Sequence, residues 1–171
     1  MRRLALVAAV AVLAGSTIAG QAEDRWRDFS FLLGEWIGEG KGSPGEGAGT
    51  FSFEIGLDGR VLVRKSHSTY PATKDRPAFA HDDLMLIYRE GGGMRAIYAD
   101  NEDHVIHYVV SVVTDPPGLV FLSDPAPNAP RFRFRYTRVG KDKVNGRFEI
   151  APPGKPDAFS LYIEGDARRA R

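Results

Sequence analysis

The sequence contains no cysteine among its 171 residues. Disulfide bonds, thiolate nucleophiles, iron–sulfur clusters and cysteine-type zinc sites all need a sulfur atom, so each of them is excluded. Charge of one sign is also lacking, because 23 Lys and Arg stand against 22 Asp and Glu. A protein that binds a phosphate backbone needs a basic excess to displace counterions, so nucleic acid is not an expected partner. The chain has to fold by apolar burial and hydrogen bonding alone.

The sequence has no apolar run of the roughly 20 residues that cross a bilayer. Its longest run, residues 4–15, follows the basic segment Met1-Arg2-Arg3 and precedes small residues, which is typical of a signal peptide. Small side chains at Gly20 and Ala22 predict cleavage after Ala22. We therefore expect residues 1–22 to be a signal peptide and residues 23–171 to be a single exported domain, periplasmic or secreted, with no stable membrane anchor.

Motifs that would identify an enzyme are missing as well. The sequence has no Gly-x-Ser-x-Gly segment of the kind that exposes a nucleophilic serine. The glycine-rich stretch at 38–47 lacks the Gly-Lys-Ser/Thr of a phosphate-binding loop and is interpreted as a flexible hairpin. The sequence names no catalytic residue, and it favours a binding protein over an enzyme.

Alternation of apolar and polar residues is the main structural signal. Phe132, Phe134 and Tyr136 alternate with three arginines, a period of two that indicates a strand with one buried face. Similar runs separated by turn residues predict about ten short strands, near 34–41, 48–57, 60–70, 83–90, 94–100, 104–114, 118–123, 131–138, 144–150 and 158–165. Before them, the spacing of Trp26, Phe29 and Leu32 predicts a short helix over 24–33 that ends at Gly34.

These elements predict an all-β fold, an antiparallel meander of roughly ten strands with a short N-terminal helix. An open sheet of this size would expose two long edges, whereas a closed barrel pairs every strand and creates an interior. A barrel of ten strands is wide enough to leave space that side chains do not fill. A two-layer sandwich is the alternative.

The segment 31–40, which reads FLLGEWIGEG, resembles the opening of the calycin-like barrels, where a short helix leads into a strand with a Gly-x-Trp signature. That superfamily includes lipocalins, fatty-acid-binding proteins and nitrobindins, and the segment 34–40 looks most like nitrobindins. Segments 82–88 and 96–101 also look like a bacterial family of exported calycin-like domains whose activity is not assigned. The resemblance implies a barrel over nearly the whole mature chain, with Trp36 closing one end.

Haem is a cofactor that the nitrobindin resemblance implies. Nitrobindin-type proteins hold haem through a histidine near the C-terminal end of the barrel. The four histidines of this chain are His67, His81, His104 and His107, and none follows position 107. We therefore expect no cofactor, with a haem protein that acts on reactive nitrogen species as an alternative.

Polar residues on the predicted strands are candidates for metal or ligand contacts. His104 and His107 are three residues apart, which puts them on opposite faces of a regular strand, so no metal site is expected. The segment His81-Asp82-Asp83 is interpreted as the solvated approach to a strand. Arg64 is interpreted as facing solvent, although a buried Arg64 would need a partner and a ligand carboxylate could serve.

The function predicted from these features is an exported barrel that holds a small apolar or amphipathic molecule in its interior. Apolar wall residues would supply most of the binding, and a few polar groups would fix orientation. The residues expected to line the site are Phe51, Phe53, His67, Met85, Tyr98, His107, Phe132, Phe134, Tyr136 and Phe148. A structural envelope module without a ligand is a further alternative.

Overall fold

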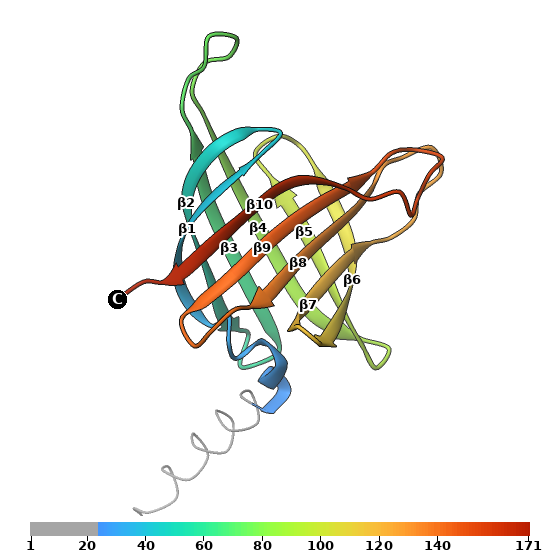
Figure 1. Cartoon of the computed structure of the whole chain (residues 1–171). Helices are drawn as coiled ribbons and strands as arrows, with labels where there is room; N and C mark the ends of the chain where they lie inside the picture. Colours follow the sequence, from blue (N-terminus) through green and yellow to red (C-terminus); the bar gives the residue numbers. More distant parts are fainter. Residues whose placement is uncertain (1–23) are drawn as a thin grey trace, which may run out of the picture.

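A computed structural model describes residues 24–171, and these residues form a closed antiparallel barrel of ten strands (Figure 1). The predicted signal peptide lies outside the described residues. Each strand pairs with its neighbours in sequence, and β1 pairs with β10 to close the ring. The all-β meander predicted from the period of two is confirmed, and the sandwich alternative is wrong. The elements are a 3-10 helix η1 (Arg27–Phe29), β1 (Gly34–Gly42), β2 (Gly45–Gly56), β3 (Val61–Tyr70), β4 (Phe79–Glu90), β5 (Gly93–Asp100), β6 (Val105–Thr114), β7 (Pro117–Ser123), β8 (Arg131–Arg138), β9 (Lys143–Ala151) and β10 (Ser160–Arg169).

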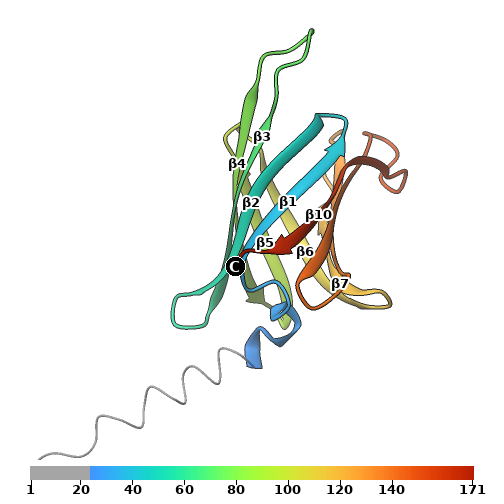
Figure 2. The same cartoon turned by 60° about the vertical axis from the view of Figure 1, so that its left-hand side comes forward.

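Strand boundaries differ from the prediction most clearly at β4. This strand begins at Phe79 rather than at residue 83, because residues 79–82 continue the ladder with β3 from Tyr70 to His67. The predicted loop at 71–81 is therefore shorter, and the β3–β4 hairpin extends beyond the rest of the barrel (Figures 1 and 2). The residues interpreted as a solvated approach belong to a paired strand, and alternate side chains of that strand face the interior.

One end of the barrel is sealed by the segment before β1. Trp26, Phe29, Leu32 and Trp36 are all at most 1% exposed, and they pack into one cluster with side chains from the strands. The indole Nε1 of Trp26 donates to the Gly59 carbonyl at 2.9 Å, and Nε1 of Trp36 donates to the Leu32 carbonyl at 2.8 Å. Both indole N–H groups at this end of the barrel are thus hydrogen-bonded. The helix is shorter than predicted, a single 3-10 turn.

The opposite end carries the rim of the barrel. In a meander the connections alternate between the two ends, and the Trp26 bond to Gly59 puts the β2–β3 turn at the sealed end. The β1–β2, β3–β4, β5–β6, β7–β8 and β9–β10 connections therefore surround the rim. Within residues 24–171, no helix is both long and apolar enough to pass through a bilayer.

Candidate functional site

A cavity of about 770 Å³ lies inside the barrel and reaches the rim. Its lining runs from rim residues such as Pro44, Arg76 and Glu102 down to Met85, Tyr108 and Val144. The volume lies within the range of about 300–1,000 Å³ that is typical of small-molecule sites. The interior is therefore only partly filled by side chains. Seven of the residues expected from the sequence line this cavity, namely Phe51, Met85, Tyr98, Phe132, Phe134, Tyr136 and Phe148.

Strands β8 and β9 supply an apolar wall, which we define as Phe132, Phe134, Phe148 and Ile150. These side chains share the inner face because Phe132 pairs with Ile150 and Phe134 with Phe148 in the β8–β9 ladder. The rings of Phe132 and Phe148 stack with centroids 5.9 Å apart, and Phe134 meets Phe148 edge to face at 6.1 Å. The arginines that alternate with them lie on the outer face, as the sequence predicted.

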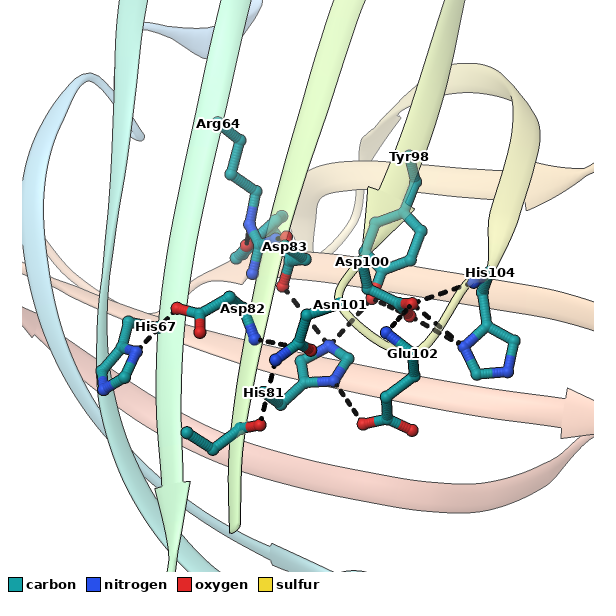
Figure 3. Close-up of polar contacts among 12 residues, drawn as sticks. Arg64, His67, His81, Asp82, Asp83, Tyr98, Asp100, Asn101, Glu102 and His104 are labelled. Atoms are coloured by element: carbon teal, nitrogen blue, oxygen red, sulfur yellow. Dashed lines mark hydrogen bonds and ion pairs between the residues drawn. The ribbon is translucent and has the colours of Figure 1, made fainter.

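Strands β3–β5 and the β5–β6 turn supply a polar wall, which we define as Arg64, His81, Asp83, Tyr98, Asp100, Glu102 and His104 (Figure 3). It lies across the strand order from the apolar wall. Arg64 and Asp83 form a buried ion pair within it, with side chains 8% and 5% exposed. Nη1 of Arg64 donates to Oδ1 of Asp83, and Nε donates to the Tyr136 hydroxyl at 2.7 Å. The interpretation of Arg64 as solvent-facing is wrong.

Burial acts against the Arg64 cation, but the charge of Asp83 and the bond to Tyr136 outweigh it. The pKa of Arg64 is consequently raised above its ordinary value, and the residue stays charged. Its guanidinium carbon also lies 5.7 Å from the Phe51 ring and 5.6 Å from the Phe134 ring. A fixed cation is thus held between aromatic rings at the cavity wall.

One ion-pair contact and a series of hydrogen bonds connect this pair with the rim (Figure 3). Nε2 of His81 lies 2.9 Å from the Tyr98 hydroxyl and 3.7 Å from Oδ2 of Asp83. Nδ1 of the same ring lies 2.9 Å from Oε1 of Glu102. The Tyr98 hydroxyl donates to Oδ2 of Asp100 at 3.1 Å. The polar wall is therefore one connected network rather than a set of separate side chains.

Asp100 holds the β5–β6 turn together. Its Oδ1 accepts from the backbone N–H of Glu102 at 2.9 Å and of His104 at 3.0 Å, and its Oδ2 lies 2.9 Å from Nδ1 of His104. Burial alone would raise the pKa of Asp100, but these bonds lower it below its usual value. The carboxylate therefore remains ionised at neutral pH.

The buried tyrosines act as hydrogen-bond groups rather than as bases. Burial raises the pKa of Tyr136 to about 12, although the Arg64 cation acts in the opposite direction. Burial and the charges of Asp83 and Asp100 raise the pKa of Tyr98 well above its ordinary value. Both hydroxyls keep their protons at neutral pH, so the cavity offers hydrogen-bond donors and acceptors without a tyrosinate.

Three of the expected site residues lie elsewhere. His67 and His107 lie on the outer face, because each is an odd number of positions away from the inward-facing residues of its strand. His67 forms a hydrogen bond with Asp82 on that face. Their placement in the interior is corrected. Phe53 faces inward but lies in the packed core below the cavity, where it is 1% exposed.

Sequence reasoning missed Arg64, His81, Asp83 and Asp100 as site residues. A signal for Arg64 was present, since Leu62 and Tyr70 share its side of the strand and bury that side at both ends. His81 and Asp83 gave no such signal. The outward Asp82 between them makes the segment continuously polar and hides the alternation.

The histidines and carboxylates that line the cavity are the side chains that could hold a metal ion or haem. Among residues 24–171, no group of three or more His, Asp or Glu side chains is arranged to hold a metal ion. His81 and His104 are the histidines at the cavity, and both rings already contact carboxylates. An iron bond to His81 would cost the hydrogen bond to Tyr98 or the one to Glu102. The residues present do not fit the axial ligand that the nitrobindin resemblance implies.

Comparison with known proteins shows that this chain resembles a solved structure in its fold. No protein-family model and no curated protein sequence matches the chain. The crystal structure of Rv2717c from M. tuberculosis has a TM-score of 0.54 and 17% identity, covering 85% of this chain and 97% of that one.

Two other structures align more loosely. The barrel EF1p2_mFAP2b, bound to DFHBI, has a TM-score of 0.42 and 10% identity over 84% of this chain and 98% of that one. A DUF3598-family protein of unknown function from Nostoc punctiforme has a TM-score of 0.30 and 8% identity over 85% and 98%. The likeness to Rv2717c is one of fold, and the fold of this chain is a closed ten-stranded antiparallel barrel.

Proposed function

We propose that this protein is an exported binding barrel that holds a small apolar or amphipathic molecule inside its cavity. The observation that carries the proposal is a cavity of about 770 Å³ with an apolar wall on one side and a polar wall on the other. An apolar wall contributes affinity by removing ligand surface from water, and a few fixed polar groups orient the ligand. The sealed end below the cavity keeps water from entering there.

Export of the protein rests on the N-terminal sequence. The basic residues, the short apolar run and the small residues before Glu23 support cleavage and transport out of the cytoplasm. Mass determination on protein recovered from the periplasm or medium of its own cells tests this part. A mature chain that begins at Glu23 is expected, whereas recovery of the full chain from the cytoplasm alone would contradict export.

Binding is tested with a neutral apolar dye, Nile red, whose fluorescence rises when it leaves water. Saturable binding to the mature protein is expected. Gly146 lines the cavity, and a Cβ there would point toward Phe134 and Tyr136 with its nearest contact at 3.8 Å. The Gly146→Leu variant therefore places a side chain in the cavity, and we expect it to weaken dye binding about tenfold or more.

The matched control is Gly140→Leu in the β8–β9 turn. A Cβ at Gly140 meets nothing within 4 Å, so this variant adds the same side chain outside the cavity. It should bind the dye as the parent protein does. Equal binding by both variants, or no binding by the parent protein, would refute the cavity as the site and favour a structural module. Native mass spectrometry of protein from its own source then identifies what the cavity retains.

A further inference from the structure

The guanidinium of Arg64 is only partly used by the protein. Nε donates to Tyr136 and Nη1 to Asp83, while Nη2 makes no hydrogen bond to any residue that the structure describes. Nη2 is also absent from the buried polar atoms that lack a partner, so it keeps an accessible surface, and Arg64 lines the cavity. The side chain of Arg64 is only 8% exposed. Its Nη2 is therefore one strong donor that faces the interior.

The charge of Arg64 is already balanced by Asp83. Both side chains are buried at the cavity wall, and their contact is direct. A ligand carboxylate that reached Nη2 would place a second anion beside the Asp83 carboxylate in a medium of low dielectric constant. It would also lose its hydration shell without meeting an unbalanced positive charge. A neutral acceptor, such as the carbonyl of an amide or ester, meets the donor without this repulsion.

The surroundings of the pair add to the same bias. Asp100 and Glu102 are two more acidic groups of the polar wall, and they face His81 and His104 rather than a fixed cation. The other arginine that lines the cavity, Arg76, lies at the rim with its guanidinium 4.2 Å from the Phe79 ring. Its Nη2 donates to the Pro44 carbonyl. Arg76 is therefore held against the rim.

We infer that the cavity selects neutral amphiphiles that carry a carbonyl-type hydrogen-bond acceptor, and rejects the corresponding carboxylates, because Asp83 neutralises Arg64 in advance. This inference rests on the proposed binding function. The acceptor would meet Nη2 of Arg64, and the hydrocarbon part would lie against the apolar wall. Asp83 thus determines specificity through its ion pair with Arg64, without contacting the ligand itself.

The test compares lauramide with laurate, which share one hydrocarbon chain and differ in charge. Each displaces Nile red from the mature protein at pH 8, where a free carboxylic acid is ionised. Lauramide is expected to bind about tenfold or more tightly than laurate. Equal affinities, or tighter binding of laurate, would overturn the inference while dye binding still supports the container. Failure of Nile red itself to bind would instead refute the proposed function.

Two variants locate the effect at the pair. Asp83→Asn leaves the Arg64 charge unbalanced, so laurate binding should strengthen and the preference should reverse. The double variant Arg64→Met with Asp83→Asn removes both charges of the pair. Its affinities for lauramide and laurate should then differ only by the cost of removing each ligand's head group from water. If Asp83→Asn fails to fold, the double variant provides the comparison, because removing both members of a buried ion pair is tolerated better than removing one.

The matched control is Glu149→Gln. Glu149 is a buried carboxylate on the outer face, 7% exposed in its side chain and 2.6 Å from Nε of Arg133. It undergoes the same acid-to-amide change at a buried ion pair outside the cavity. The preference for lauramide should persist in this variant. A reversal there as well would show that net charge, rather than the Arg64–Asp83 pair, controls selection.

Discussion

Replacing Trp36 with phenylalanine removes the indole that connects the sealed end to the barrel wall. The ring is fully buried, stacks on Phe51 with centroids 5.9 Å apart and lies 4.5 Å from the Arg169 guanidinium. Loss of the bond to the Leu32 carbonyl costs about 0.5–1.5 kcal/mol. The smaller ring leaves unfilled space and loses apolar burial, for about 1–2 kcal/mol more. We expect the free energy of unfolding to fall by about 2–3 kcal/mol, and the melting temperature to fall by roughly 5–10 °C.

The assay is urea denaturation followed by circular dichroism, with Ile37→Ala as the control. Ile37 is the next residue of β1 but lies on the outer face with 38% exposure, so its truncation should cost clearly less. A parallel measurement on Arg169→Met and on the double variant gives the coupling between the guanidinium and the indole, expected at about 0.5–1 kcal/mol. A loss at Trp36 no larger than at Ile37 would refute the view that the indole fastens the sealed end.

Three other outcomes follow from the structure. Because the pKa of Asp100 is lowered on folding, its carboxylate stabilises the protein above about pH 4, and Asp100→Asn should destabilise it in urea titrations at pH 7. That difference should fade as the pH falls through the lowered pKa, and a constant difference would contradict it. A Cβ at Gly165 would lie 2.4 Å from the Glu39 carbonyl oxygen, so Gly165→Ala should cost about 1–3 kcal/mol, whereas Gly140→Ala should be nearly neutral in thermal melts. We expect that titration with haem gives no Soret band that differs between the parent protein and His81→Ala. A Soret band that shifts in the variant would support the haem alternative.

The barrel could be predicted from the sequence because its signal is local. Alternation over a few residues, as in Phe132, Phe134 and Tyr136, fixes which side chains share a face, and turn residues fix where strands end. Gly91 and Gly92 show the second point, since both adopt positive φ, of 57° and 81°, in the β4–β5 hairpin. Closure followed from the number of strands and from the cost of exposed edges.

The polar wall could not be predicted in the same way, because its members meet across strands. Arg64 contacts Tyr136, which is 72 residues away, and His81 contacts Tyr98 through the β4–β5 pairing. In β3 the apolar residues Leu62 and Tyr70 share the side of Arg64, but Val61 and Val63 share the side of Lys65, so this strand by itself gives conflicting signals for which side is inside. The two outward histidines, His67 and His107, were misplaced for this reason.

The sealed end has a consequence for the exchange of any bound molecule. The cluster around Trp26 and Trp36 closes one end of the barrel. A ligand would therefore enter and leave through the other end, which the five rim connections surround. Substitutions in the β3–β4 or β5–β6 connection should then alter the rates of uptake and loss together. The equilibrium occupancy, which depends on the walls further in, would change far less.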